Sequence, residues 1–213
     1  SSTATIYRQS PPTSLDSLGY ALDSNESGFT VGYATPTSYA LLWDNETVLW
    51  DNETLPPFSG LLEARSINSF NEIIGVRQIE NNYQRIFSYD IFSGSLNTLS
   101  TLGGANAWGN QINDRGQITG GAEDEQGNIL AFRFDGSTMN NLGRLDGYQH
   151  SEGLDINEKN AVVGTAFNSN NNYTGKRAIY AAESQGLVNL GTIHNDIDSS
   201  AKAINNDGLI VGQ

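Results

Sequence analysis

Hydrophobic and polar residues alternate along this chain in short runs, and glycine or asparagine interrupts the runs every few positions. An alternation with a period of two residues, bounded by turn residues, is typical of short β-strands. The 3.6-residue periodicity of an amphipathic helix is absent from the sequence. The pattern therefore predicts an all-β protein.

An eight-residue motif recurs five times and predicts tight hairpins. It begins with an asparagine, ends with a glycine, and has Gly or Asn as its fourth residue. The copies are NESGFTVG (25–32), NSFNEIIG (68–75), NDRGQITG (113–120), NEKNAVVG (157–164) and NNDGLIVG (205–212). Gly and Asn tolerate a left-handed backbone. We therefore expect a strand that ends at the motif asparagine, a short turn, and a second strand.

The spacing of the motifs indicates a β-propeller. The asparagines lie 43, 45, 44 and 48 residues apart, and four-stranded propeller blades repeat every 40–50 residues or so. Third strands are predicted at YALLW (39–43), RIFSY (85–89), AFRF (131–134) and RAIYA (177–181). Fourth strands are predicted at LSTLGG (99–104), NLG (141–143) and NLG (189–191). Each period thus supplies one antiparallel blade.

The two ends of the chain are predicted to share a blade. Residues 3–19 align with residues 177–191, a third and fourth strand, whereas residues 201–213 hold a first and second strand. The prediction is one domain over residues 1–213, a five-bladed propeller whose closure leaves no sheet edge exposed. Its units are about 20–62, 63–107, 108–152, 153–200, and 201–213 with 1–19. The alternative is an open array of repeats.

Four segments carry a resemblance to a known family: STLGG, AFRF, NQINDRGQITG and AKAINNDGLIVG. They resemble the HAF-repeat family of exported bacterial proteins, and the resemblance covers nearly the whole chain. It implies propeller-like repeats and a secreted or cell-surface bacterial protein. It implies no activity, because the family is named for its repeat.

Composition excludes several classes of function. Eleven Lys and Arg residues stand against 24 Asp and Glu, for a net charge of −13. A nucleic-acid partner needs a basic surface, so none is expected. No run of about 18 apolar residues predicts insertion into a membrane. Cysteine is absent, which excludes disulfides and zinc–thiolate sites. We expect no cofactor and no metal site.

Candidate binding residues lie in the long, variable connections between repeats, where propellers and other repeat scaffolds carry their ligand sites. The candidates are Trp108, Tyr148, His150, Glu152, His194 and Asp196. One interpretation is a shallow polar–aromatic face that binds a glycan or a protein ligand. The other is that these are solvated loop residues, with the aromatic rings covering blade edges.

Catalysis is the weaker prediction. A glycosidase needs two carboxylates roughly 5–10 Å apart, and Asp23, Asp155, Glu63 and Glu152 are candidates without a pair that stands out. Motifs for a serine nucleophile, a phosphate loop or a zinc protease are absent. We therefore predict a non-catalytic extracellular binding module, lectin-like and specific for carbohydrate. The alternatives are a protein-interaction scaffold of a larger surface or matrix protein and, third, a glycoside-cleaving enzyme.

The duplicated stretch LWDNETVLWDNETL (42–55) has two interpretations. In the first, Val48 to Asp51 form a fourth strand after a turn at Asn45-Glu46, which places Trp43 opposite Val48 and Leu41 opposite Trp50. In the second, the second copy is the turn between the third and fourth strands. Under both, the tryptophans are predicted to pack within the blade.

Overall fold

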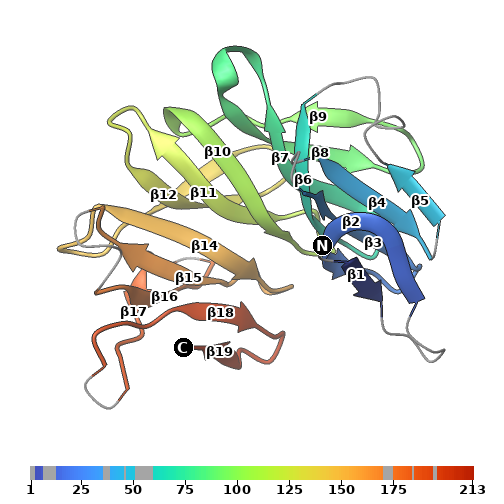
Figure 1. Cartoon of the computed structure of the whole chain (residues 1–213). Helices are drawn as coiled ribbons and strands as arrows, with labels where there is room; N and C mark the ends of the chain where they lie inside the picture. The colour runs from blue at the N-terminus through green and yellow to red at the C-terminus, as the bar shows by residue number, and fades with distance from the viewer. Residues whose placement is uncertain are drawn as a thin grey trace. The chain divides into compact units, whose positions relative to one another are not determined.

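The computed structural model describes residues 3–6, 13–35, 39–45, 47–50, 60–169, 175–183, 185–193 and 196–213, and the described part is all-β apart from one short 3-10 helix. Figure 1 labels its strands. The chain divides into two compact units, Ser1–Leu99 and Ser100–Gln213. Each unit is described by itself.

The first unit holds two antiparallel sheets. The first sheet contains β1 (Thr3–Ile6), β2 (Thr13–Ser24), β3 (Phe29–Ala34), β4 (Ala40–Asp44) and β5 (Thr47–Trp50), in that order. The second sheet contains β6 (Leu61–Ile67), β7 (Glu72–Gln78), β8 (Gln84–Asp90) and β9 (Leu96–Thr98), with η1 (Glu80–Asn82) between β7 and β8. In both sheets each strand pairs with its neighbour along the chain.

The second unit holds three antiparallel sheets, drawn from green to red in Figure 1. The third sheet contains β10 (Gly103–Ile112), β11 (Ile118–Asp124), β12 (Ile129–Phe134) and β13 (Met139–Gly143). The fourth contains β14 (His150–Ile156), β15 (Val162–Phe167), β16 (Arg177–Ala181) and β17 (Val188–Asn189). The fifth has two strands among the described residues, β18 (Ala201–Ile204) and β19 (Ile210–Gly212).

The five predicted hairpins are confirmed. Strands β2, β6, β10, β14 and β18 each end directly before a motif asparagine. The fourth motif residue has a positive φ in every copy, at Gly28, Asn71, Gly116, Asn160 and Gly208. The side-chain oxygen of the motif asparagine accepts hydrogen bonds from the turn; Asn157 Oδ1, for example, accepts the N–H groups of Lys159 and Ala161, both at 3.0 Å. These bonds satisfy backbone groups that the tight turn would otherwise leave unpaired.

The motif glycine is required by close approach of two strands. A Cβ on Gly164 would overlap the carbonyl oxygen of Glu152 on β14. The motif glycines of the other repeats meet the equivalent carbonyl, which belongs to Tyr20, Glu63, Trp108 or Ser200. The two strands of each motif hairpin therefore approach each other at a point where no side chain fits.

The duplicated stretch forms the predicted hairpin of β4 and β5. Trp43 pairs with Val48, as expected, but a register shift places Leu42 rather than Leu41 opposite Trp50. Both tryptophans are buried, and the Trp50 ring meets the Tyr89 ring edge-on with centroids 4.8 Å apart. Their predicted packing role is confirmed. The second copy beyond Trp50 lies outside the described residues.

One predicted strand is wrong. Residues 99–104 do not form a fourth strand, because β9 ends at Thr98 and Gly103 begins β10. A turn with Gly94 at positive φ brings Leu96 directly opposite Tyr89, so pairing starts earlier in the chain than the Leu-Gly-Gly sequence suggested. Residues 99–102 instead connect β9 to β10, and Gly103 and Gly104 are the first residues of β10.

The predicted sharing of a blade by the two chain ends is not confirmed. β1 pairs with β2 in the first sheet, with Ile6 opposite Thr13, rather than joining β18 and β19. Because the two paired segments are close in sequence, their association costs less loop-closure entropy than joining residues at opposite ends of the chain. The similarity between residues 3–19 and residues 177–191 indicated strands near the start of the chain, but it did not show which strands they pair with.

Motif residues also join neighbouring sheets within a unit. Asn25 Nδ2 donates to Asn68 O at 3.0 Å in the first unit. In the second unit, Asn113 Nδ2 donates to Asn157 O and Asn157 Nδ2 donates to Asn205 O, both at 2.9 Å. Apolar side chains from neighbouring sheets also pack together, as in the cluster of Ala131 from the third sheet with Ala166 and Ile179 from the fourth. The motif thus builds the hairpin and also the contact between sheets.

Candidate functional site

Two of the predicted binding residues, Trp108 and Glu152, meet between the third and fourth sheets. Trp108 Nε1 donates to Glu152 Oε1 at 2.7 Å, and Asn110 Nδ2 donates to the same oxygen at 2.8 Å. The indole also lies on Gly121, where a Cβ would come within 2.6 Å of the ring. One face and the N–H group of this tryptophan are therefore used inside the protein.

His150 is a buried residue of a strand, which corrects its prediction as a loop residue. It begins β14 and is only 7% exposed. Its Nδ1 accepts the N–H of Ile129 at 3.0 Å, its Nε2 lies 2.6 Å from Ser169 Oγ, and its ring packs on Phe167. Removal from water lowers the pKa of His150, because burial disfavours the charged imidazolium. The neutral ring caps the start of the neighbouring strand β12.

The remaining candidates do not join this pair. Tyr148 is half-buried against the cluster of Ala131, Ala166 and Ile179. Asp196 is exposed, and its backbone N–H donates to Ile193 O at 3.0 Å. His194 lies outside the described residues. Apart from the contact between Trp108 and Glu152, the predicted residues that the structure describes do not form one site.

Each candidate catalytic carboxylate has a hydrogen-bond or ion-pair partner within the protein. Asp23 accepts the Ile67 N–H at 3.0 Å, and Asp155 accepts the Ile204 N–H at 2.7 Å, in both cases from the next sheet. Glu63 forms an ion pair with the neighbouring Arg65 at 2.7 Å. With Glu152 bound to Trp108 and Asn110, all four carboxylates have structural partners.

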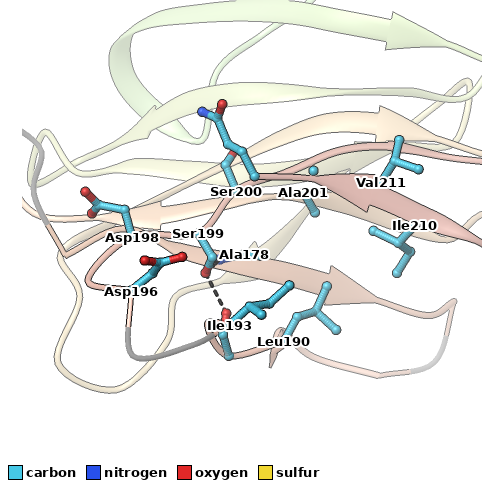
Figure 2. A pocket seen from close by; sticks show the side chains of 13 residues that line it. Ala178, Leu190, Ile193, Asp196, Asp198, Ser199, Ser200, Ala201, Ile210 and Val211 are labelled. Atoms are coloured by element: carbon cyan, nitrogen blue, oxygen red, sulfur yellow. Dashed lines mark hydrogen bonds between the residues drawn. The ribbon is translucent and has the colours of Figure 1, made fainter.

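The second unit has a pocket that contains one predicted binding residue, Asp196, beside residues that the sequence did not point to. We call it the β19 pocket; it has a volume of about 210 Å³. Its lining comprises Ala178, Leu190, Gly191, Ile193, Asp196, Asp198, Ser199, Ser200, Ala201 and residues 210–213. Figure 2 shows Asp196 and Asp198 on one side of it and Ile210 and Val211 on the other. The feature of the sequence that could have indicated this pocket is a pair of apolar residues, Leu190 and Ile193, in a mostly polar connection.

A serine fixes one wall of the β19 pocket. Ser199 Oγ donates to Gly191 O at 2.6 Å and accepts the Ala178 N–H at 2.9 Å. These bonds tie the start of the fifth repeat to the third and fourth strands of the fourth sheet. The apolar side chains of Leu190 and Ile193 are left 44% and 70% exposed beside this wall. The pocket is therefore an apolar surface with an acidic rim.

The described residues give no sign of a metal site or of a membrane-crossing helix. No three His, Cys, Asp or Glu side chains among them are grouped so that they could hold a metal ion. Within the same residues, no helix has the length and apolar character that crossing a membrane requires.

Comparison by sequence finds a family model that is similar to the C-terminal part of the chain. A family model described as "Protein of unknown function (DUF3466)" matches residues 132–213, which include the fourth and fifth motifs. Comparison with curated proteins gives no match.

Comparison by structure identifies the fold. The chain is similar to TolB from Acinetobacter baumannii, with a TM-score of 0.60 and 11% identity over 89% of this chain and 48% of that protein. It is also similar to a structure described as a TolB from Agrobacterium tumefaciens, with a TM-score of 0.60 and 13% identity over 94% of this chain and 77% of that one. The chain thus spans about half the length of the first of these. At such identities the likeness concerns the fold, and the chain has an all-β fold of the β-propeller type.

Proposed function

We propose that this chain is a non-catalytic binding module whose ligand is a segment of another protein. The observation that carries the proposal is the β19 pocket, an apolar pocket with Asp196 and Asp198 at its rim. Apolar pockets with a few polar groups at the rim are the usual form of a ligand site. An apolar lining with two carboxylates at the rim suits a polypeptide, which brings apolar and basic side chains together.

The geometry gives less support to a carbohydrate ligand. A sugar site combines an aromatic face with amide or carboxylate groups that remain available for hydroxyls. At Trp108 one ring face lies on Gly121 and the indole N–H is bound to Glu152. Lectin-like binding stays a prediction, and so does the third alternative, glycoside cleavage.

We further propose that the five repeats form five blades of one closed ring and that the protein is exported by a bacterium. The five motifs and their period support the blade count, and the resemblance to HAF repeats supports export. Closure by residues 3–19 would require β1 to leave β2. Small-angle scattering tests the ring, since a compact chain of this length has a radius of gyration near 17 Å, whereas an open array would be larger.

The binding function is tested by offering both ligand classes to the same immobilised chain. We expect a library of displayed random peptides to yield an enriched consensus, and a glycan array to give no signal above a control protein of equal charge. A glycan that binds saturably, together with a peptide selection that yields no consensus, would overturn the proposal. The equal-charge control separates recognition from attraction to a protein of net charge −13.

A further inference from the structure

We propose that Arg77 and Arg85 form a binding site for a phosphate monoester, a group that carries close to two negative charges. Both side chains belong to the second sheet, on β7 and β8 (Figure 1). This sheet is part of the first unit, whereas the β19 pocket is part of the second. The inference therefore goes beyond the proposed protein-binding function and does not rest on it.

The two arginines lie directly opposite each other. Arg77 pairs with Arg85 in the register of β7 and β8, and residues paired in this way hold their side chains on the same face of the sheet. A guanidinium stays charged in a protein at any ordinary pH, so the pair brings two positive charges together. Like charges directly opposite each other destabilise a sheet. An anion bound between them would remove this cost.

The pair stands out in a chain with few basic residues. Eleven Lys and Arg residues are outnumbered by 24 Asp and Glu, so a carboxylate could readily have been placed opposite Arg77. The neighbouring Arg65 does have such a partner, Glu63, at 2.7 Å. Arg77 forms no ion pair with any carboxylate that the structure describes.

The other repeats show that the fold does not require an arginine at this position. Arg77 follows the motif glycine Gly75 by two residues. The residues at the same place in the first, third and fourth repeats are Ala34, Ala122 and Ala166, and each is at most 1% exposed. A small buried side chain therefore meets the packing requirement here. The second repeat has a large charged residue in its place, and a ligand gives that exchange a reason.

Thr98 holds the guanidinium of Arg77 in one orientation. Arg77 Nη1 donates to Thr98 Oγ1 at 2.8 Å. Thr98 lies on β9, which pairs with β8, so the Arg77 side chain crosses the strand that carries Arg85. The bond to Thr98 leaves Nε and Nη2, the edge of a guanidinium that can bind two oxygens of one anion.

That edge contains a donor without a partner. Arg77 Nε is buried and makes no hydrogen bond, and a buried donor left in this state is costly. An oxyanion reaches it when the guanidinium turns toward Arg85, and the new hydrogen bond then offsets the cost. Binding thus relieves two unfavourable features of the same side chain, the unpaired Nε and the opposed charge.

Arg85 is placed by the residues just before it. Its Nη1 donates to Gln84 O at 2.9 Å, and its guanidinium carbon lies 6.0 Å from the centre of the Tyr83 ring. A guanidinium at this distance is attracted by the face of an aromatic ring. Because the Tyr83 ring is 42% exposed, this attraction keeps the charge of Arg85 near the surface, where a ligand can approach it.

Charge and shape favour a phosphate monoester over a carboxylate. Arginine binds both groups through pairs of hydrogen bonds. A carboxylate carries one charge and would leave one of the two guanidinium ions uncompensated. A phosphate monoester carries close to two charges at neutral pH and has three oxygens to accept hydrogen bonds. The same group occurs on phosphorylated sugars and on phosphorylated side chains, so the test includes one compound of each kind.

The test follows the arginine Nε–H signals of the purified 213-residue chain by NMR while inorganic phosphate is added. The signal that disappears in Arg77→Ala belongs to Arg77. We expect it to shift saturably with a dissociation constant of about 1 mM or less, the weak end of specific affinity. Acetate should bind at least tenfold more weakly. Glucose 6-phosphate and a phosphoserine peptide are titrated in parallel, and the one that binds more tightly than inorganic phosphate identifies the carrier.

Three variants separate binding from stability. Arg77→Ala restores the residue of the other repeats, and Arg85→Ala removes its partner. Each should lower phosphate affinity at least tenfold, because hydrogen bonds to a charged group are lost. The thermal midpoint of Arg77→Ala should not fall, since the opposed charge and the unpaired donor disappear together. The control is Arg115→Ala, which removes the same charge from a side chain that is 65% exposed in the second unit, and its phosphate affinity should change less than twofold.

Four results would overturn the inference. The first is no saturable shift up to about 10 mM phosphate, ten times the expected constant. The second is equal affinity for acetate and phosphate. The third is an equal loss of affinity in Arg77→Ala and Arg115→Ala, which would mean attraction to charge alone. The fourth is a lower thermal midpoint for Arg77→Ala with phosphate affinity unchanged, which would assign Arg77 a structural role. The selection of displayed peptides tests the protein-binding function separately, so either idea can fail alone.

Discussion

The contact between sheets can be tested at Asn157, which is 5% exposed. Its Oδ1 accepts the N–H groups of Lys159 and Ala161, and its Nδ2 donates to Asn205 O in the next sheet. Asn157→Ala removes all three hydrogen bonds at once. It also leaves the Ala161 N–H, in a buried position, without that partner.

The expected loss of stability follows from these contacts. Each hydrogen bond contributes about 1 kcal/mol net, and a buried group left unpaired costs 1–3 kcal/mol or so. Asn157→Ala should therefore lower the free energy of unfolding by about 3 kcal/mol. For a protein of this size the midpoint of thermal unfolding should fall by about 10 °C. Urea denaturation followed by circular dichroism measures the free energy, and calorimetry measures the midpoint.

Asn205 provides the matched control. It makes the same two turn bonds, to the N–H groups of Asp207 and Leu209, but it is exposed. Water replaces the lost partners there, so Asn205→Ala should cost less than about 1 kcal/mol. Asn157→Asp should fall between the two, because it keeps the acceptor and loses the donor. Equal costs for Asn157→Ala and Asn205→Ala would refute a role for the motif asparagine in joining sheets.

Two further predictions concern the hairpin and the buried histidine. Gly164→Ala should destabilise the protein by at least about 2 kcal/mol, because the added Cβ overlaps the Glu152 carbonyl. Gly186→Ala is the control: open space surrounds Gly186, so the free energy of unfolding should change by less than about 0.5 kcal/mol. Urea unfolding measures both. Burial lowers the pKa of His150 below its unfolded value near 6.5, so its contribution to stability is complete above that pH and is lost as pH falls through the folded pKa. As the pH is lowered from 8 to 5, the urea midpoint should therefore fall less steeply for His150→Leu than for the unchanged protein. Equal slopes would contradict the assignment of neutral His150 as the acceptor of the Ile129 N–H.

The hairpins were predictable from sequence because their causes are local. A turn with a left-handed fourth residue restricts that position to Gly or Asn, and the overlap at the motif glycine excludes every other side chain. The first constraint acts within the eight-residue motif and the second between residues twelve apart, such as Glu152 and Gly164, so both leave a recognisable pattern in all five copies. The pairing of Trp43 with Val48 was predictable for the same reason, since a short turn sets the register.

The candidate site was harder to predict because its determinants are not local. The sequence shows that Trp108 and Glu152 are 44 residues apart, and it does not show that they bind each other. His150 has the surroundings of a loop in the sequence, but the Ile129 N–H and Phe167 draw it into the core. The pairing of β1 with β2 was not predicted for the same reason, because the sequence of a strand does not show which other strand it pairs with.

The repeats also explain why function is expected at the fifth sheet. Trp108, Glu152 and Ser200 occupy the same place in three successive repeats, five residues before the motif asparagine. Their types differ, and yet each contacts the neighbouring sheet, Trp108 through Glu152 and Ser200 through Thr165 at 2.6 Å. Variation between repeats therefore does not by itself mark a ligand site, since variable residues can complete the contact between sheets. Apolar side chains that stay exposed beside an otherwise formed contact are the better indicator, and Leu190 and Ile193 in the lining of the β19 pocket are 44% and 70% exposed.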